Sequence, residues 1–409
     1  MKIYQILMVL STSTLLTILS MCLYQYDNLH YKNPELQKNN TNAIVKPCIC
    51  QTIDCVMQGK WIPRFNISIN EVMEVERIHK LYSPKKDFPY EENLRHDEHC
   101  GPFYDVNSFA SQCKKNSSKP CCNEQLQKCG GNETYCNCDA CTNYNISLKH
   151  ASLHNWVEHF CPNENFNTKS TCDFLSNHFS SMLFVGDSLV RQFFGGLLMH
   201  LTDDKIHGTL ISTLDQSIFS ECKGELQFLE KEICRTSFAS NWDDIKKNPK
   251  YCKYNKQKIK VSFKELYNIF SFQSEISIFD RLVEETNPMI VAGAGVHENY
   301  NFIRIIKKYI KPLLDITKKN KNVTLIWVAY PPPTDMKPAV YFRTQSLLRT
   351  KEFNNDIERF CKENNIKFFD TFKIFKGMHS FDGTHYGTEL NFVKFKIFIK
   401  YLRMFYEQN

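Results

Sequence analysis

The sequence predicts an α/β fold built on a parallel, doubly wound sheet. Apolar runs at 182–185, 289–292 and 323–329 have the length and composition of buried strands. Each run is followed by a segment whose apolar residues recur with the period of a helix. Strands that alternate with helices in this way form parallel sheets with helices on both faces, because each helix carries the chain back to the same edge.

The strand expected at 182–185 runs into a helix expected at 189–200 through Gly186, Asp187 and Ser188. This junction places the Ser188 hydroxyl at the carboxyl end of the strand, beside backbone N–H groups whose partial positive charge favours an anion. A serine nucleophile and its oxyanion need such an environment. Gly-Asp-Ser is also ordinary turn chemistry, and Asp187 is expected to bond the turn backbone rather than to act as a catalyst.

The later elements follow in chain order. The strand at 289–292 has a glycine-rich exit at the same edge of the sheet as Ser188, where open α/β sheets bind their ligands. The strand at 323–329 ends at a run of three prolines that cannot continue it. The other expected elements are a strand at 258–263, a helix at 303–317 interrupted near Pro312, a helix at 340–362, a strand at 366–369 and a helix at 389–406.

Asp382 and His385 stand three residues apart in a turn before the last helix. A base that deprotonates Ser188 needs an imidazole within hydrogen-bond reach and a carboxylate that holds its tautomer. The three-residue spacing lets one loop supply both groups. The sequence therefore predicts a triad in which His385 accepts the Ser188 proton and Asp382 orients the imidazole, the arrangement that serves acyl transfer.

The order of these residues, serine first and then aspartate and histidine together near the C-terminus, resembles that of the SGNH (GDSL-type) hydrolases. The motifs at 184–191 and 382–385 are more closely similar to those of a membrane-anchored branch. That branch includes PC-esterase-like proteins, trichome-birefringence-like O-acetyltransferases, neurexophilin-and-PC-esterase-domain proteins and sialate O-acetyltransferases. Residues 55–61 resemble another motif of this branch, and so do Trp156, Cys161 and Phe166. The resemblance therefore covers roughly 55–400. It implies an SGNH-like three-layer α/β/α fold.

The resemblance also implies an oxyanion hole that uses the backbone N–H of Ser188. SGNH enzymes carry a Gly-x-Asn block after a strand of the sheet, whereas this chain has Gly295 and His297 there, with Asn299 two residues later. The membrane-anchored branch often has Gly-His at this point, so His297 resembles its counterpart; the alternative is a histidine that braces the loop. Arg191, one helical turn past the serine, is the other candidate donor, unless it forms a salt bridge.

The enzymes that this chain resembles transfer acetyl groups to glycans in the Golgi. The expected function is therefore transfer of an acetyl group from an acetyl donor to the hydroxyls of a glycan or glycoconjugate, through an acyl-serine intermediate. A carbohydrate or lipid esterase of the same fold is one alternative. The other is a non-catalytic secreted or membrane-anchored interaction protein, which the intact triad argues against and the altered oxyanion block keeps open.

The N-terminal residues 3–24 carry no charge, are mostly apolar and are long enough to span a bilayer. With Lys2 before them, 1–24 is expected to be an uncleaved signal anchor that leaves the rest of the chain in the lumen of the Golgi; a cleaved signal peptide and a secreted protein are the alternative. Eighteen cysteines indicate an oxidising compartment. N-glycosylation acceptors agree with this location and occur at Asn39, Asn66, Asn116, Asn132, Asn145 and Asn322.

Four regions are expected along the chain. A flexible stem at 25–47 follows the anchor, and a cysteine-rich luminal region at 48–172 is part of the catalytic domain or packed on it. The catalytic domain spans 173–409 and carries a family-specific elaboration at about 201–280. The odd number of luminal cysteines predicts one that is free or paired with another chain, unless Cys22 takes part.

The densest cysteine patch, within 100–141, is expected to be an insert held by disulfides. Zinc thiolates at Cys136, Cys138 and Cys141 are one alternative, and a sugar-binding loop is another. His96 and His99 lie in the same cysteine-rich part of the chain, and neither a metal nor a cofactor is expected to take part in the reaction. The net charge of +7 is spread through lysine pairs without a nucleic-acid-binding motif, so no nucleic-acid partner is expected.

Overall fold

The computed structural model describes residues 53–82, 97–99, 150–158 and 166–407, with isolated positions between 113 and 130. Short gaps within the last range fall at 230, 270–271, 273–278, 280–281, 283, 335–336, 342–343 and 376. The predicted anchor at 1–24 and stem at 25–47 lie outside the described residues. Among the residues that are described, no helix combines the length and the apolar character needed to cross a membrane.

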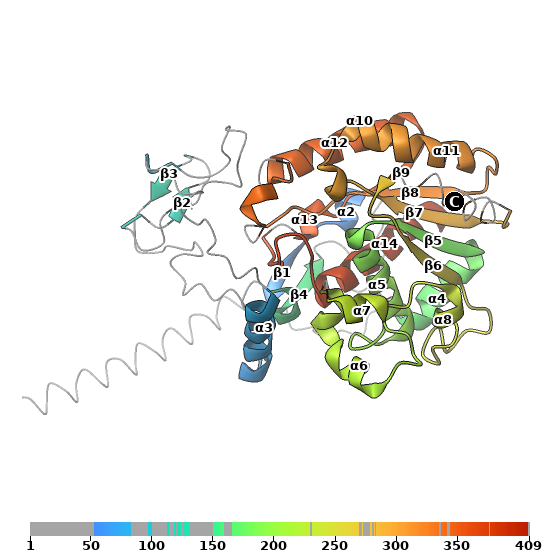
Figure 1. Ribbon diagram of the computed structural model, residues 1–409, viewed down its shortest axis with the longest axis horizontal. Helices are drawn as coiled ribbons and strands as arrows, with labels where there is room; N and C mark the ends of the chain where they lie inside the picture. The colour runs from blue at the N-terminus through green and yellow to red at the C-terminus, as the bar shows by residue number, and fades with distance from the viewer. Residues whose placement is uncertain are drawn as a thin grey trace, which may run out of the picture. The chain divides into compact units, whose positions relative to one another are not determined.

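A five-stranded parallel sheet forms the centre of the fold, as the sequence predicts (Figure 1). The strands lie in the spatial order β6-β5-β7-β8-β9, and every neighbouring pair is parallel. Their bounds are β5 Ser181–Gly186, β6 Lys260–Glu265, β7 Pro288–Gly293, β8 Thr324–Val328 and β9 Lys367–Phe369. The chain winds from β5 outward to β6 and then crosses to β7 on the other side, so a topological switch point lies between β5 and β7.

Helices cover both faces of the sheet, which makes three layers (Figure 1). On one face pack α4 (Thr168–His178), α5 (Ser188–Thr202) and α14 (Thr388–Tyr406), and on the other pack α10 (Phe302–Ile305), α11 (Lys311–Thr317) and α12 (Leu347–Glu363). Alternate residues of β5 serve the two faces: Phe184 joins the first core and Val185 the second. A strand buried on both faces reads as a continuous apolar run, which explains why this strand was predictable.

The expected interruption of the helix at 303–317 is confirmed and takes a specific form. Between α10 and α11 the backbone forms a π-helix at Ile306–Ile310 (η6). Pro312 follows within two residues, and proline has no N–H for the carbonyl four residues earlier and its ring crowds that carbonyl. The wider turn before Pro312 relieves this conflict.

The helix expected at 340–362 begins later than predicted, at Leu347. Ser346 caps it, because its hydroxyl accepts a hydrogen bond from the backbone N–H of Arg349 at 3.2 Å. Ala339–Tyr341 forms a separate 3₁₀ turn (η7). The prediction was wrong because it extended the apolar period of the helix back through 340–346. Ser346 lies in this segment, and as the cap it fixes the first helical residue at Leu347.

A two-stranded antiparallel sheet was not predicted. β1 (Gly59–Pro63) pairs with β4 (His154–Glu158), which places Trp61 opposite Trp156 with ring centroids 5.4 Å apart. The Trp61 indole N–H also donates to the carbonyl of Ile374 at 2.8 Å, and both tryptophans pack against the core on the α5 and α14 face. The predicted cysteine-rich region therefore packs against the α5 and α14 face of the central sheet through these two aromatic side chains.

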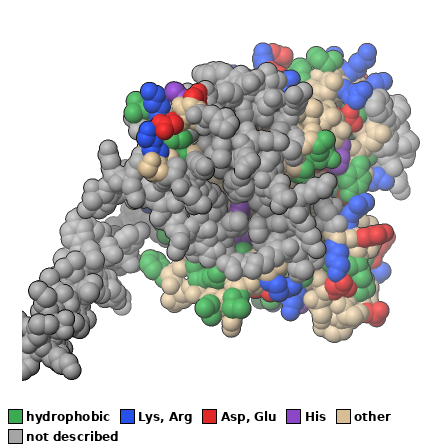
Figure 2. Space-filling view, turned by 60° about the vertical axis from the view of Figure 1, so that its left-hand side comes forward, with side chains coloured by type: hydrophobic (Ala, Val, Ile, Leu, Met, Phe, Trp, Pro, Cys, Tyr) green, Lys and Arg blue, Asp and Glu red, His purple; other side chains and the backbone are tan. Residues whose placement is uncertain are grey.

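The remaining described elements are short or peripheral. They are α2 (Ile53–Val56), α3 (Ile69–Tyr82), η2 (Ala151–Leu153), α6 (Gln216–Glu221), η3 (Gly224–Phe228), α7 (Glu232–Thr236), α8 (Trp242–Ile245), η5 (Val296–Glu298) and α13 (Phe372–Phe375). A hairpin of β2 (Cys121–Asn123) and β3 (Lys128–Gly130) lies in the predicted insert. Where described residues are visible in Figure 2, Lys and Arg side chains lie among Asp and Glu side chains.

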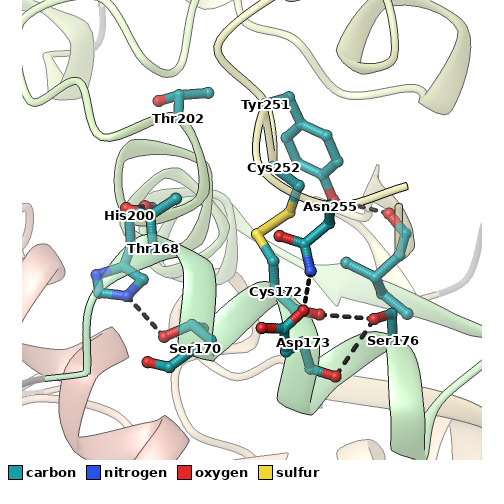
Figure 3. The surroundings of a disulfide bond; sticks show 12 residues. Thr168, Ser170, Cys172, Asp173, Ser176, His200, Thr202, Tyr251, Cys252 and Asn255 are labelled. Carbon is teal, nitrogen blue, oxygen red and sulfur yellow. Dashed lines mark hydrogen bonds between the residues drawn. A yellow bond between two sulfur atoms is a disulfide. The ribbon is translucent and has the colours of Figure 1, made fainter. Parts of the chain in front are cut away.

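Three disulfides join described cysteines: Cys113–Cys129, Cys172–Cys252 and Cys222–Cys234. Figure 3 shows the second, which ties α4 to the segment before β6, with Asn255 donating to the Asp173 carboxylate beside it. Cys361, buried on α12, is free. Cys136, Cys138 and Cys141 lie outside the described residues, so the zinc alternative is untested.

Candidate active site

The structure brings together the three residues predicted to form the triad. Ser188 is the first residue of α5, and His385 and Asp382 lie on the loop before α14. The Ser188 hydroxyl is 2.7 Å from Nε2 of His385, and Nδ1 of His385 is 2.6 Å from Oδ2 of Asp382. With the proton on Nδ1, the imidazole donates to the carboxylate and accepts from the serine, which is the tautomer that a general base needs.

The turn from Asp382 to His385 explains their three-residue spacing. Oδ1 of Asp382 accepts the backbone N–H groups of Thr384 at 2.9 Å and His385 at 2.8 Å, which leaves Oδ2 for the imidazole. Gly383 has φ of 83°, in the left-handed region that glycine adopts without strain. Burial by itself raises the pKa of the Asp382 carboxyl, but the charge of His385 and the hydrogen bonds from the turn outweigh it and hold that pKa well below its usual range.

The loop that follows β8 braces this turn. The Thr334 backbone N–H donates to the carbonyl of Gly383 at 3.0 Å, and the Tyr386 hydroxyl donates to the carbonyl of Pro332 at 2.6 Å. Lys337, on the same loop, donates from Nζ to the hydroxyl of Thr384 at 2.6 Å. The proline run was expected only to end a strand, whereas in the structure Pro332 also accepts a hydrogen bond from Tyr386, just after the turn that carries Asp382 and His385.

The predicted elaboration at 201–280 contacts the start of α14, which follows this turn, and also α5. Glu225, in η3, accepts the backbone N–H of Thr388 at 2.8 Å, at the start of α14. Burial raises the pKa of this carboxyl to about 7, although the hydrogen bonds from Thr388 oppose the shift. The amide of Gln192, on α5, donates to the carbonyl of Phe228 at 2.9 Å in the same short helix.

Two glycines allow β5 and β7 to end side by side at the switch point. A Cβ atom on Gly186 would lie 2.1 Å from the carbonyl oxygen of Gly293, and one on Gly293 would lie 2.9 Å from a methyl group of Val190. The contact at Gly186 is with backbone and is far too short for a real Cβ atom, so Gly186 cannot be replaced without moving a strand, whereas the contact at Gly293 is with a side chain. The turn that carries Ser188 therefore depends on a close approach of two strand ends.

Asp187 bonds the turn backbone, as expected, and also accepts a hydrogen bond from a side chain of the loop after β8, two strands away from β5 in the sheet. Its Oδ1 accepts the backbone N–H of Leu189 at 3.1 Å, and its Oδ2 accepts the hydroxyl of Tyr330, the second residue after β8. Burial raises the pKa of Asp187, and the hydrogen bond from Tyr330 partly opposes that shift. Asp187 thus joins α5 to the β8 loop.

Arg191, a predicted oxyanion donor, forms an ion pair. Its Nε lies 3.7 Å from Oε1 of Glu265 at the end of β6, and the Arg191 side chain is 5% exposed. Arg235 reaches the other oxygen of the same carboxylate, also at 3.7 Å. This is the salt-bridge alternative considered for Arg191, and its role as a donor to the oxyanion stays a prediction.

The other predicted oxyanion residues lie on η5 and at its two ends. His297 is exposed and meets the ring of Tyr267 edge-on, with centroids 5.1 Å apart. Asn299 accepts a hydrogen bond from the Gln345 amide at 3.2 Å, and the same amide donates to the carbonyl of Val296 at 2.9 Å. Gly295 packs against aromatic rings, where a Cβ atom would lie 2.9 Å from Phe353.

Within the described residues, the structure shows no hydrogen bond from Arg191, Gly295, His297 or Asn299 to Ser188. Their assignment to the oxyanion hole therefore remains a prediction. The Ser188 backbone N–H is better placed, because the first residues of a helix have no intrahelical acceptor for their N–H groups.

Sequence reasoning missed several residues that contact the predicted site residues or their neighbours: Arg235, Tyr267, Tyr330, Lys337 and Gln345. Tyr267 and Tyr330 each follow a strand end by two residues. The rule that ligands bind at the carboxyl edge of a parallel sheet would have pointed to both positions. Among the residues that are described, no group of three or more His, Cys, Asp and Glu side chains is arranged to hold a metal.

No family model and no curated protein matches this chain. Solved structures of lipases and esterases do. A GDSL-like lipase from Bacteroides thetaiotaomicron is 13% identical over 56% of this chain and 88% of that chain, with a TM-score of 0.31. A lipase/acylhydrolase from Enterococcus faecalis is 12% identical, covering 55% and 95%, with a TM-score of 0.30.

A catalytic mutant of an acetylxylan esterase from Geobacillus stearothermophilus is 13% identical, covering 54% of this chain and 93% of that chain, with a TM-score of 0.28. These structural neighbours are a GDSL-like lipase, a lipase/acylhydrolase and an acetylxylan esterase. Similarity this low carries no inference about the reaction. The resemblance to the membrane-anchored branch stays a prediction.

Proposed function

We propose that this protein catalyses acyl transfer through Ser188, and that its reaction is transfer of an acetyl group to the hydroxyls of a glycan. The observation that carries the proposal is the pair of short contacts that join Ser188 to His385 and His385 to Asp382. A hydroxyl is a weak nucleophile until an adjacent base removes its proton, and these contacts supply the base and the carboxylate that orients it.

The reaction has two halves. In the first, Oγ of Ser188 attacks the ester carbonyl of the donor while Nε2 of His385 takes the serine proton; the donor C–O bond then breaks, and His385 gives the proton to the leaving alcohol. In the second, a glycan hydroxyl attacks the acyl-serine, His385 takes the hydroxyl proton, and the proton returns to Ser188 as the new ester leaves. Asp382 stabilises the imidazolium in both halves. With water as the acceptor, the same steps hydrolyse the ester.

Polar and aromatic side chains at the carboxyl edge of β6 and β7 support a sugar as the acceptor. Tyr267 is half-buried, with the Arg235 guanidinium 4.9 Å above its ring and the exposed His297 at its edge. Rings and hydrogen-bond donors of this kind suit sugar hydroxyls better than an alkyl chain. A luminal location in the Golgi membrane, with the predicted N-terminal helix as anchor, belongs to the same proposal and rests on the sequence pattern.

Fluorophosphonate labelling of the full-length protein tests the nucleophile. We expect one label per chain in the wild type and none in Ser188→Ala, with the control Ser220→Ala, an exposed serine on α6, labelled normally. Turnover of p-nitrophenyl acetate with free monosaccharides present then separates the acceptors, because mass spectrometry distinguishes an acetylated sugar from acetate. Absence of labelling in a folded, disulfide-intact preparation would contradict the proposal and favour a binding protein; acetate as the sole product would favour an esterase.

A further inference from the structure

Lys337 is a buried lysine that touches the catalytic turn. It lies on the loop after β8, and only 2% of its surface is exposed. Its Nζ donates to the hydroxyl of Thr384 at 2.6 Å, and Thr384 stands between Gly383 and His385 in the turn that carries the base. The backbone of the same loop bonds this turn through Thr334, so Lys337 approaches it on a fixed segment.

The charged groups that face Lys337 are the carboxylates of Asp382 and Asp187, both of which attract its ammonium, and the ring of Tyr341 lies 5.6 Å from Nζ. Burial lowers the pKa of Lys337 to about 8, and the two carboxylates oppose that shift. The ammonium therefore keeps its charge at neutral pH while it is nearly excluded from water.

Stability alone does not explain this lysine. Burying an ammonium costs several kcal/mol unless it is well paired. Its one hydrogen bond to a described residue is to the neutral hydroxyl of Thr384. A buried charge that lies beside proposed catalytic groups is a candidate for a role in the reaction.

We propose that Lys337 is a positioning residue for the triad, which holds the turn from Asp382 to His385 through Thr384 and uses its charge to oppose protonation of His385. The inference rests on the proposed function, since it assigns a role within the Ser188 site. The hydrogen bond to Thr384 fixes the backbone N–H groups that orient the Asp382 carboxylate. The charged groups that face His385 are the same two carboxylates, Asp382, whose Oδ2 lies 2.6 Å from Nδ1, and Asp187. The Lys337 ammonium attracts both and so offsets part of the negative charge that favours the imidazolium, which keeps His385 neutral, and able to accept the serine proton, down to a lower pH.

Three variants separate position from charge, with Lys400→Met as the control. Lys337→Met removes both the hydrogen bond and the charge, Lys337→Arg keeps the charge, and Thr384→Val removes the acceptor hydroxyl but leaves the lysine. Lys400 is also a buried lysine, paired with Glu158, on the far part of α14. Each full-length variant is assayed for the rate of fluorophosphonate labelling and for kcat/KM on p-nitrophenyl acetate between pH 5 and 8, with its melting temperature.

We expect Lys337→Met to lower kcat/KM about tenfold to a hundredfold at pH 7, because small displacements of catalytic groups have effects of this size. The acid limb of its pH profile should move up by about one unit, since one neighbouring charge is lost. Lys337→Arg should keep the acid limb in place. Thr384→Val should lower the rate without moving that limb, and Lys400→Met should change only the melting temperature.

A folded Lys337→Met protein with the wild-type rate and pH profile would overturn the inference, as would an equal shift of the acid limb in Lys400→Met. If Lys337→Met does not fold, the other two variants decide: a Thr384→Val protein with the wild-type rate, or a displaced acid limb in Lys337→Arg, would overturn it. Failure of the proposed function is distinguishable, because the wild type would then show no labelling that depends on Ser188.

Discussion

Replacement of Asp382 by asparagine should abolish the base while leaving the fold intact. The two backbone N–H groups of Thr384 and His385 donate to Oδ1, at 2.9 Å and 2.8 Å. In Asp382→Asn the amide oxygen must take that place, because an NH₂ group there would face two donors. The NH₂ group then occupies the position of Oδ2, where the carboxylate oxygen lies 2.6 Å from Nδ1 of His385.

This orientation selects the wrong histidine tautomer. Facing a donor, Nδ1 must act as an acceptor, so the ring proton moves to Nε2, which can then no longer take the Ser188 proton. We expect kcat to fall by a factor of about 10⁴, as in other serine triads with this substitution. A factor of that size corresponds to about 5.5 kcal/mol in the activation free energy.

The matched variant is Asp382→Ala, which removes the turn contacts as well. It leaves the backbone N–H groups of Thr384 and His385 without the carboxylate, which should lower the free energy of unfolding by about 1–3 kcal/mol. Asp382→Asn should melt close to the wild type. Fluorophosphonate labelling rates and thermal melts check both statements. An Asp382→Asn protein that keeps more than about a tenth of the labelling rate, or that loses as much stability as Asp382→Ala, would refute the reasoning.

Three further predictions concern stability. Burial, with smaller contributions from Lys396 and Lys205, lowers the pKa of His200 to about 4. The contribution of this histidine to the free energy of unfolding is therefore fully present above pH 6.5. It is lost as the pH falls toward 4, because only the unfolded chain takes up the proton in that range. Denaturant unfolding should show that His200→Gln removes roughly 3 kcal/mol of this pH dependence; an unchanged slope would contradict it. Loss of Cys172–Cys252, with a separation of 80 residues, should destabilise by about 4.5 kcal/mol and loss of Cys222–Cys234, with 12, by about 3 kcal/mol; the reverse order would count against a chain-entropy origin. Gly186→Ala should lower the free energy of unfolding by about 3 kcal/mol and reduce labelling of Ser188. A variant that melts at the wild-type temperature would argue against the close contact between Gly186 and Gly293.

The sequence by itself determined the strands of the central sheet, their parallel arrangement and the three residues predicted to form a triad. Strands such as β5 and β7 are buried on both faces, so they appear as short continuous apolar runs that need no tertiary information to detect. Ser188 was predictable because it follows such a strand directly, and the spacing of Asp382 and His385 was predictable because one turn can supply both groups. Where a local pattern was ambiguous, the prediction failed: the helix start at Leu347 depends on a cap that the apolar period hides.

Only the tertiary structure decided which distant residues meet these elements. Arg191 pairs with Glu265 because β5 and β6 are neighbours in the sheet, an order that no local pattern contains. Trp61 lies opposite Trp156, and Lys337 donates to Thr384. Each of these contacts joins segments that are far apart along the chain, and no local sequence pattern indicates that they meet. Local periodicity reports what each segment buries, whereas the partners around a catalytic group follow from the order and packing of the whole sheet.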